Sequence, residues 1–183
     1  MEQPITLTIP LLSASCQSAI LQQGFKKQLQ PHQYFSKEGA YPKEIGLVLS
    51  GLLRIYYLDE SGKDWNKAFL QRDRFVMATP NIKEKSTTYI QALLPTQMFC
   101  VSLENWQKIA HQFPELKEVH QQVLMEYMKK KHEREISLLT QDAARRYATF
   151  QQQFPDLEDL IPHYHIASYL GITPTQLSRI RKK

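Results

Sequence analysis

The sequence predicts an α+β fold in which a strand-rich N-terminal region is followed by helices. Short strand-like runs, separated by turns, occupy residues 25–101. At Ser102 the hydrophobic period changes from that of a strand to that of a helix. Residues 115–139 contain neither glycine nor proline, so they can form one long helix. These three observations place the strands first and the helices last along the chain.

The strand-rich region is divided by turn-forming residues. Ser50-Gly51 and residues 59–63 separate the first strands, and Pro95-Thr96 separates the last two. Strands that recur every 8–12 residues or so favour a sandwich, a barrel or a roll. The strands predicted most clearly are residues 47–49, 52–58, 64–70, 87–94 and 98–102.

Two short helices flank these strands. The first is predicted over residues 11–23, with Ser13 near its start and Gly24 at its end. The second begins after Ser102, which is a suitable cap, and ends near Phe113.

The long helix predicted over residues 115–139 would extend roughly 37 Å. Residues 129–135 are highly charged, and we expect Lys129–Lys131 to form a solvated face rather than a DNA contact. A narrow apolar stripe with polar flanks suits a coiled-coil-like contact between two chains, and it also suits packing on the helix's own domain. The stripe consists of Leu116, Val119, Val123 and Tyr127, with Leu124 and Met128 adjoining.

A further helix is predicted over residues 141–154, with Ala143, Tyr147 and Phe150 on one face. Pro155 ends it, and residues 156–159 are predicted to be a polar linker.

Residues 163–180 carry the most specific pattern, that of two short helices joined by a tight turn. Ala167 allows the helices to cross closely, and Gly171 supplies the positive φ of the turn. Thr173 and Pro174 suit the start of the second helix. The positions expected to be buried are Ile166, Leu170, Ile172, Leu177 and Ile180. An ordinary helical hairpin would explain the apolar spacing, but it would not require a cap and a basic surface to coincide with it.

The distribution of charge also favours a nucleic acid as partner. The net charge is only +5, but the last 23 residues contain no acid. Basic, hydroxyl and amide side chains can grip phosphates or read base edges. We expect Arg179 to be the leading base contact, and Arg181, Lys182 and Lys183 to engage phosphates. The complete set of predicted DNA-binding residues is Thr173, Thr175, Gln176, Ser178, Arg179, Arg181, Lys182 and Lys183.

Several segments together resemble the Crp/Fnr family of transcription regulators over nearly the whole chain. Residues 166–173 and 177–183 resemble its helix-turn-helix, and residues 138–147 resemble the junction that precedes it. Residues 46–57 and 90–93 resemble strands of its cyclic-nucleotide-binding-like β-roll. The resemblance implies an antiparallel β-roll over 1–113, a dimerisation helix over 114–139 and a helix-turn-helix domain over 140–183. It also implies a homodimer whose two recognition helices enter major grooves about one DNA turn apart.

The chain departs from that family at two sites. Where nucleotide-binding members carry glycine and an Arg-Ser or Arg-Thr pair, residues 76–92 contain neither glycine nor arginine. Ser86 and Thr87 stand in place of the pair, and the nearby Lys85 cannot supply a bidentate fork. We therefore predict that cyclic AMP is not the effector. In the recognition helix, Pro174 and Thr175 stand where many members carry arginine and glutamate, so sequence preference should differ. The chain also stops at Lys183 without a β-hairpin wing, so we expect weaker DNA binding or greater reliance on the dimer.

Other classes of protein are disfavoured. A metal enzyme of the cupin type needs several histidines among the strands, and only His32 lies there. His163 and His165 are expected on the surface near phosphate rather than at a metal. Cys16 and Cys100 are too few for a disulfide framework or an iron–sulfur cluster and are expected to be buried apolar residues. We therefore expect no catalytic residue, no metal and no cofactor.

The sequence thus predicts a dimeric, sequence-specific DNA-binding transcription regulator. Neither a signal peptide nor a membrane-spanning stretch is recognised, which predicts a cytoplasmic protein without a membrane partner. Its expected partners are double-stranded DNA and a second copy of the chain, with RNA polymerase and an unknown small-molecule effector of the roll as further candidates. The alternative is a ligand- or partner-binding β-roll module whose helix-turn-helix no longer binds specific DNA. A metal-dependent roll enzyme is the third hypothesis.

Overall fold

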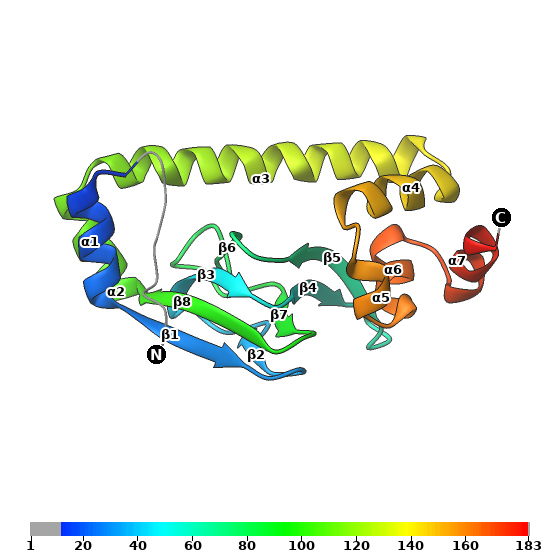
Figure 1. The fold of residues 1–183 in the computed structure, drawn as a ribbon, viewed down its shortest axis with the longest axis horizontal. Helices are drawn as coiled ribbons and strands as arrows, with labels where there is room; N and C mark the ends of the chain where they lie inside the picture. The colour runs from blue at the N-terminus through cyan, green and yellow to red at the C-terminus, as the bar shows by residue number, and fades with distance from the viewer. Residues whose placement is uncertain (1–11, 183) are drawn as a thin grey trace.

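The computed structural model describes residues 12–182 (Figure 1). The predicted α+β fold is confirmed, because an antiparallel β-roll comes first and the helices follow. The strands are β1 (Gly24–Leu29), β2 (Tyr34–Ser36), β3 (Glu44–Ser50), β4 (Leu53–Leu58), β5 (Asp64–Leu70), β6 (Phe75–Val76), β7 (Tyr89–Ala92) and β8 (Thr96–Ser102). They form one sheet in the order β1-β8-β3-β6 and a second in the order β2-β7-β4-β5. The paired strands run antiparallel in both sheets.

The interior of the roll is filled by apolar side chains from both sheets. Val48, Leu53, Ile90, Met98 and Cys100 are all fully buried in one cluster. Along β8 they alternate with Phe99 and Val101, which are buried on the opposite face of the sheet in the cluster that includes residues of α1 and α2. The two sheets therefore close on a packed apolar centre.

The tight connection between β3 and β4 depends on Gly51. Its φ is +91°, in the region that favours glycine. A Cβ at this position would lie 2.3 Å from the backbone oxygen of Pro95. The turn predicted at Ser50-Gly51 is therefore present, and it requires glycine because a larger residue would collide with the backbone at Pro95.

Two helices cover one end of the roll. Helix α1 (Ala14–Gln23) is capped by Ser13, and α2 (Leu103–Gln112) is capped by Ser102. Both caps agree with the sequence analysis. The predicted start of the first helix at Leu11 lies outside the described residues.

Helix α3 (Glu115–Thr140) runs the length of the molecule beside the roll (Figure 1), which confirms the predicted long helix. Leu116 and Val119, at its beginning, are buried against α1 and α2. Beyond them, a series of apolar side chains remains exposed: Leu124, Met125, Tyr127, Met128, Ile136, Leu138 and Leu139.

The remaining helices lie together at the other end of the molecule (Figure 1). They are α4 (Ala143–Gln153), α5 (Leu157–Leu160), α6 (His163–Leu170) and α7 (Pro174–Arg181). The prediction of a polar linker over 156–159 was wrong, since Leu157 begins a helical turn and is fully buried. A single apolar side chain in that acidic segment enters the core, and this burial orders the segment.

The core of these C-terminal helices is continuous with the roll. Phe150, Leu157, Ile166 and Leu177 are buried in one cluster with Phe69 of β5. The ring of Phe69 packs edge-on against Phe150, with centroids 6.3 Å apart. The C-terminal helices are therefore docked on the roll rather than attached only through α3.

Candidate nucleic-acid interface

Helices α6 and α7 form the predicted helix-turn-helix. Gly171 has φ +68°, and its N–H donates to the carbonyl oxygens of Ala167 and Ser168. Thr173 caps α7, where its side chain and that of Gln176 form a reciprocal capping box. Pro174 occupies the first turn of the helix, where its missing N–H costs nothing. The predicted turn and cap are both confirmed.

The outer face of α7 is polar and open to solvent. Leu177 is buried beneath the helix and Ile180 is half-buried. The exposed side chains of this face, which we call the α7 face, are Thr175, Gln176, Ser178, Arg179 and Lys182. These five were all predicted from the sequence to contact DNA. Lys183 lies outside the described residues.

Two of the predicted DNA-binding residues, Thr173 and Gln176, form hydrogen bonds with each other at the start of α7. The side-chain oxygen of Gln176 accepts from the backbone N–H of Thr173, at 2.9 Å. The hydroxyl of Thr173 accepts from the backbone N–H of Gln176, at 3.1 Å. These capping bonds do not use the side-chain nitrogen of Gln176, so this group is the part of the pair that we expect to contact DNA.

Arg181 belongs to a cluster that ties α7 to the helices behind it. Its guanidinium forms an ion pair with Glu158 and lies 3.0 Å from Nδ1 of His163. Tyr147 donates to the same carboxylate at 2.7 Å. Burial opposes the charge of Glu158, but the hydrogen bonds from Tyr147 and Gln151 and the charge of Arg181 lower its pKa. The charge of Arg181 is therefore compensated inside the domain, whereas no ion pair involves Arg179 among residues 12–182.

His165 does not lie where the sequence analysis placed it. Only 3% of its surface is exposed, so the expected surface position near phosphate was wrong. The cause is that α6 packs on β5, which puts His165 against the roll. His163, two residues earlier, does stay exposed.

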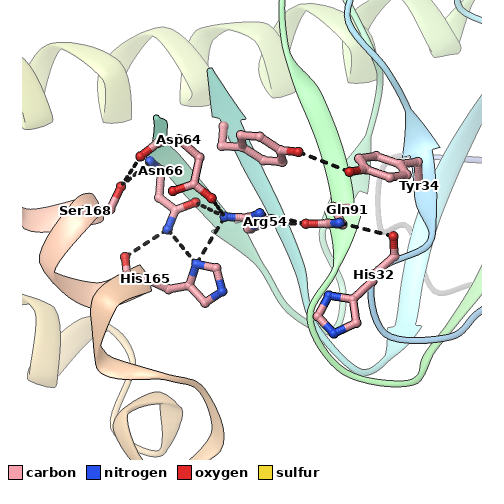
Figure 2. Close-up of polar contacts among 9 residues, drawn as sticks. His32, Tyr34, Arg54, Asp64, Asn66, Gln91, His165 and Ser168 are labelled. Carbon is pink, nitrogen blue, oxygen red and sulfur yellow. Dashed lines mark hydrogen bonds and ion pairs between the residues drawn. The ribbon is translucent and has the colours of Figure 1, made fainter. Parts of the chain in front are cut away.

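The polar side chains that contact His165 come from the roll (Figure 2). Arg54 Nη1 lies 3.1 Å from His165 Nδ1 and 2.5 Å from Asp64 Oδ2. Arg54 Nε and Nη2 both donate to Gln91 Oε1, at 2.9 and 2.8 Å. Burial first, and the charge of Arg54 second, lower the pKa of His165 to about 4. The imidazole is therefore neutral at neutral pH, with Nδ1 as an acceptor for the guanidinium.

Arg54 and Asn66, which contact His165, were not among the candidate site residues predicted from the sequence. One signal was present for Arg54, since a charged residue stands between Leu53 and Ile55 in an apolar strand. For Asn66 we see no such signal in the sequence.

Residues 85–87 stand where the sequence analysis expected a phosphate-binding pair in nucleotide-binding members of the family. In this structure, Ser86 forms hydrogen bonds within the protein. Ser86 is 2% exposed, and its hydroxyl lies 2.8 Å from the carbonyl oxygen of Thr88 and 3.1 Å from that of Ala78. Lys85 lies over the ring of Tyr41, at 5.6 Å from its centroid. Thr87 is exposed. None of these groups offers the fork of an arginine.

The histidines, acids and cysteines of the described part of the chain were also compared with metal-site geometry. Residues 12–182 contain no group of three or more His, Cys, Asp or Glu side chains that could hold a metal ion. Cys16 and Cys100 are both buried, as predicted, and burial raises the pKa of the Cys100 thiol to about 12. None of the helices described is long and apolar enough to cross a membrane.

Comparison with known proteins supports the predicted β-roll and the arrangement of the helices that follow it. Residues 26–113 match the family model of the cyclic nucleotide-binding domain. The structure is similar to FixK2 from Bradyrhizobium japonicum, with a TM-score of 0.77 and 17% identity over 87% of this chain and 83% of that one. It is also similar to a protein from Eubacterium rectale described as a transcriptional regulator of the Crp/Fnr family, with a TM-score of 0.75 and 17% identity over 95% and 85% of the two chains.

The chain has the Crp/Fnr fold. The resemblance that the sequence predicted is thereby confirmed. A third protein with this fold is the c-di-GMP-responsive global regulator CLP of Xanthomonas campestris, with a TM-score of 0.73 and 12% identity over 93% of this chain and 90% of CLP. A search of curated proteins finds no match. Within the Crp/Fnr fold, the α7 face occupies the outer surface of the helix-turn-helix, and α3 is the long helix that precedes it.

Proposed function

We propose that this Crp/Fnr-fold protein is a transcription regulator that binds specific double-stranded DNA as a homodimer. The observation that carries the proposal is the α7 face, an exposed polar surface on a capped helix that ends in basic residues. A helix of this kind can enter the major groove, where hydroxyl, amide and guanidinium groups read base edges. The fold neighbours described as regulators agree with this proposal, and they give no support to an enzyme.

The structure also indicates how the DNA contacts would be divided. Arg179 is exposed and available for a base edge, with Thr175, Gln176 and Ser178 beside it. Lys182 is exposed at the end of the helix and suits a phosphate. Arg181, paired with Glu158, would hold α7 in place instead of gripping phosphate.

The exposed apolar residues of α3 support the homodimer. Leu124, Tyr127 and Met128 lie on consecutive turns and remain 36% to 51% exposed. A helix that exposes apolar side chains at this spacing is suited to a second helix. A second copy of α3 is the partner that the proposed dimer supplies.

Cyclic AMP is not the effector in this proposal. The hydroxyl of Ser86, where relatives place an arginine, is engaged by backbone carbonyls, so the segment lacks a fork for the cyclic phosphate. CLP is described as responsive to c-di-GMP, which shows that proteins of this fold can respond to other molecules. An unknown effector and RNA polymerase are further partners to be sought, and the regulator would act in the cytoplasm.

The test is fluorescence anisotropy on DNA from upstream of the protein's own gene, followed by a genome-wide selection of sites. Wild-type binding should survive random competitor DNA and weaken steeply as salt rises. Arg179→Ala should cost about 1–3 kcal/mol on the selected site. Lys182→Ala should reduce the slope of log affinity against log salt by about one phosphate contact, and Arg181→Gln should leave that slope unchanged.

Equal, weak binding to every sequence, unaffected by Arg179→Ala, would contradict the proposal. The alternative of a partner-binding module without specific DNA would then stand. Sedimentation of the wild type and of Leu124→Asp tests the dimer separately, and the wild type should be the larger species. Calorimetry that shows micromolar binding of cyclic AMP would overturn the statement about the effector.

A further inference from the structure

Strand β5 lies at the edge of its sheet, beside β4 on one side only. An edge strand presents backbone N–H and C=O groups that need partners. Two elements outside the roll supply them here. Ser168 of α6 accepts from the N–H of Asn66 at 2.8 Å and donates to the carbonyl oxygen of Asp64 at 3.1 Å.

The long helix contacts the same point of β5. Arg134 Nη2 donates to the carbonyl oxygen of Asn66 at 3.3 Å and to that of Tyr169 at 2.5 Å. The guanidinium of Arg134 also lies over the ring of Tyr169, 4.0 Å from its centroid. One arginine of α3 therefore joins the edge of the roll to the end of α6.

The side chain of Asn66 completes this set of contacts. Its Nδ2 donates to the carbonyl oxygen of His165 at 2.9 Å and lies 3.3 Å from Nδ1 of the same residue. Its Oδ1 accepts from Arg54 at 3.3 Å. Asn66 is only 2% exposed, and all of its backbone and side-chain polar atoms have partners. Figure 2 shows those of its side chain.

We propose that Asn66 is the positioning residue of a junction between the roll, α3 and the helix-turn-helix, and that this junction presents the α7 face to DNA in one orientation. The presentation role rests on the proposed function. We call Asn66, Ser168, His165 and Arg134, with their mutual contacts, the Asn66 junction.

The arrangement of α6 and α7 supports the presentation role. A connection of only three residues, 171–173, joins the two helices, and Gly171 and Thr173 are both held by hydrogen bonds. Fixing α6 on β5 therefore also fixes α7. The α7 face stays exposed while α6 is docked, so the docked state is compatible with reading DNA. A surface that is already oriented loses less freedom on binding and so binds more tightly.

Arg54, which bonds to Asn66 from within the roll, also has partners that do not depend on α6. Arg54 is paired with Asp64 and Gln91, and its guanidinium stacks 4.0 Å from the centroid of Tyr56. The helix-turn-helix contributes three acceptors, namely the Nδ1 and the carbonyl oxygen of His165 and the hydroxyl of Ser168. Removing a contact from the α6 side should therefore release the helix-turn-helix and leave the roll folded.

The experiment breaks the junction from both sides. Asn66→Ala acts on the roll and Ser168→Ala acts on α6, while Ser168→Thr keeps the hydroxyl. Asn105→Ala is the matched control, because this side-chain amide of α2 donates to the carbonyl oxygen of Gln23 at the end of α1, away from the junction. Hydrogen exchange of the DNA-free protein and DNA affinity across a salt series are measured for each variant.

We expect exchange in residues 64–70 and 163–170 to rise by about tenfold or more in both alanine variants, with β1 and β8 unchanged. DNA affinity should fall by roughly five- to tenfold, with the same salt slope as the wild type, because no phosphate contact is lost. Ser168→Thr and Asn105→Ala should behave like the wild type in both measurements.

Three outcomes would overturn the proposal. Unchanged exchange in α6 would show that the junction does not hold the helix-turn-helix, and equal increases in β1 and β8 would show general destabilisation. Tighter DNA binding by the alanine variants would mean that docking inhibits rather than presents. If the wild type binds no specific DNA, the proposed function and the presentation role both fail, and the exchange data still decide whether the junction joins the three parts.

Discussion

Acidification tests the buried state of His165. The pKa of this residue is about 4 in the folded protein, against an ordinary value of 6.5, because burial and Arg54 disfavour the charged imidazole. Below pH 6.5 the imidazole of His165 binds a proton in the unfolded chain, whereas in the folded chain it stays neutral until the pH approaches about 4. The contribution to stability is therefore complete above pH 6.5 and is lost as the pH falls toward 4.

The size of the effect follows from the width of that window. Each pH unit within it is worth about 1.4 kcal/mol, so acidification to about pH 5 should remove about 2 kcal/mol of unfolding free energy. His165→Gln should lack this loss, because an amide oxygen can accept from Arg54 and does not titrate. His111→Gln, at an exposed position of α2, should keep it.

Urea unfolding, followed by tryptophan fluorescence at about pH 7.5 and about pH 5, measures the difference. The two reporters are Trp65, in β5 of the roll, and Trp106, in α2. Equal losses of unfolding free energy by the wild type and His165→Gln between the two pH values would contradict the buried, neutral state of His165. In that case His165 would be accessible to water in the folded protein.

Three further substitutions test local features of the fold by urea unfolding. Phe150→Ala should cost about 3–5 kcal/mol, because it empties the centre of the core shared by α4, α6 and β5, and a cost near zero would contradict that packing. Gly51→Ala should prevent folding or destabilise the roll severely, since its Cβ would meet Pro95 oxygen at 2.3 Å; a stable variant would show that the turn is wrongly placed. Thr173→Ala should cost about 1 kcal/mol by removing the cap of α7, and Thr173→Ser should restore it, unless the capping box is absent in solution.

Features that depend on neighbouring residues were predicted from the sequence. Ser102, Gly171 and Thr173 act within one helical turn, so each could be recognised from its own short segment. The long helix was predicted for the same reason, because residues 115–139 contain nothing that interrupts helical hydrogen bonding. The polar positions of the α7 face follow from helical periodicity alone once Leu177 is placed inside.

Contacts between distant segments were decided only by the tertiary structure. Arg54 and His165 are 111 residues apart in the chain, and Asn66 and His165 are 99 apart. No local pattern indicates that α6 docks on the edge of β5, so a histidine expected at the surface became a buried acceptor. Arg181 likewise forms an ion pair with Glu158, a partner that no local pattern around either residue indicates. Helix caps and periodic faces arise from local hydrogen bonding and side-chain spacing, whereas the partner of a charged or polar group depends on which distant surfaces pack together.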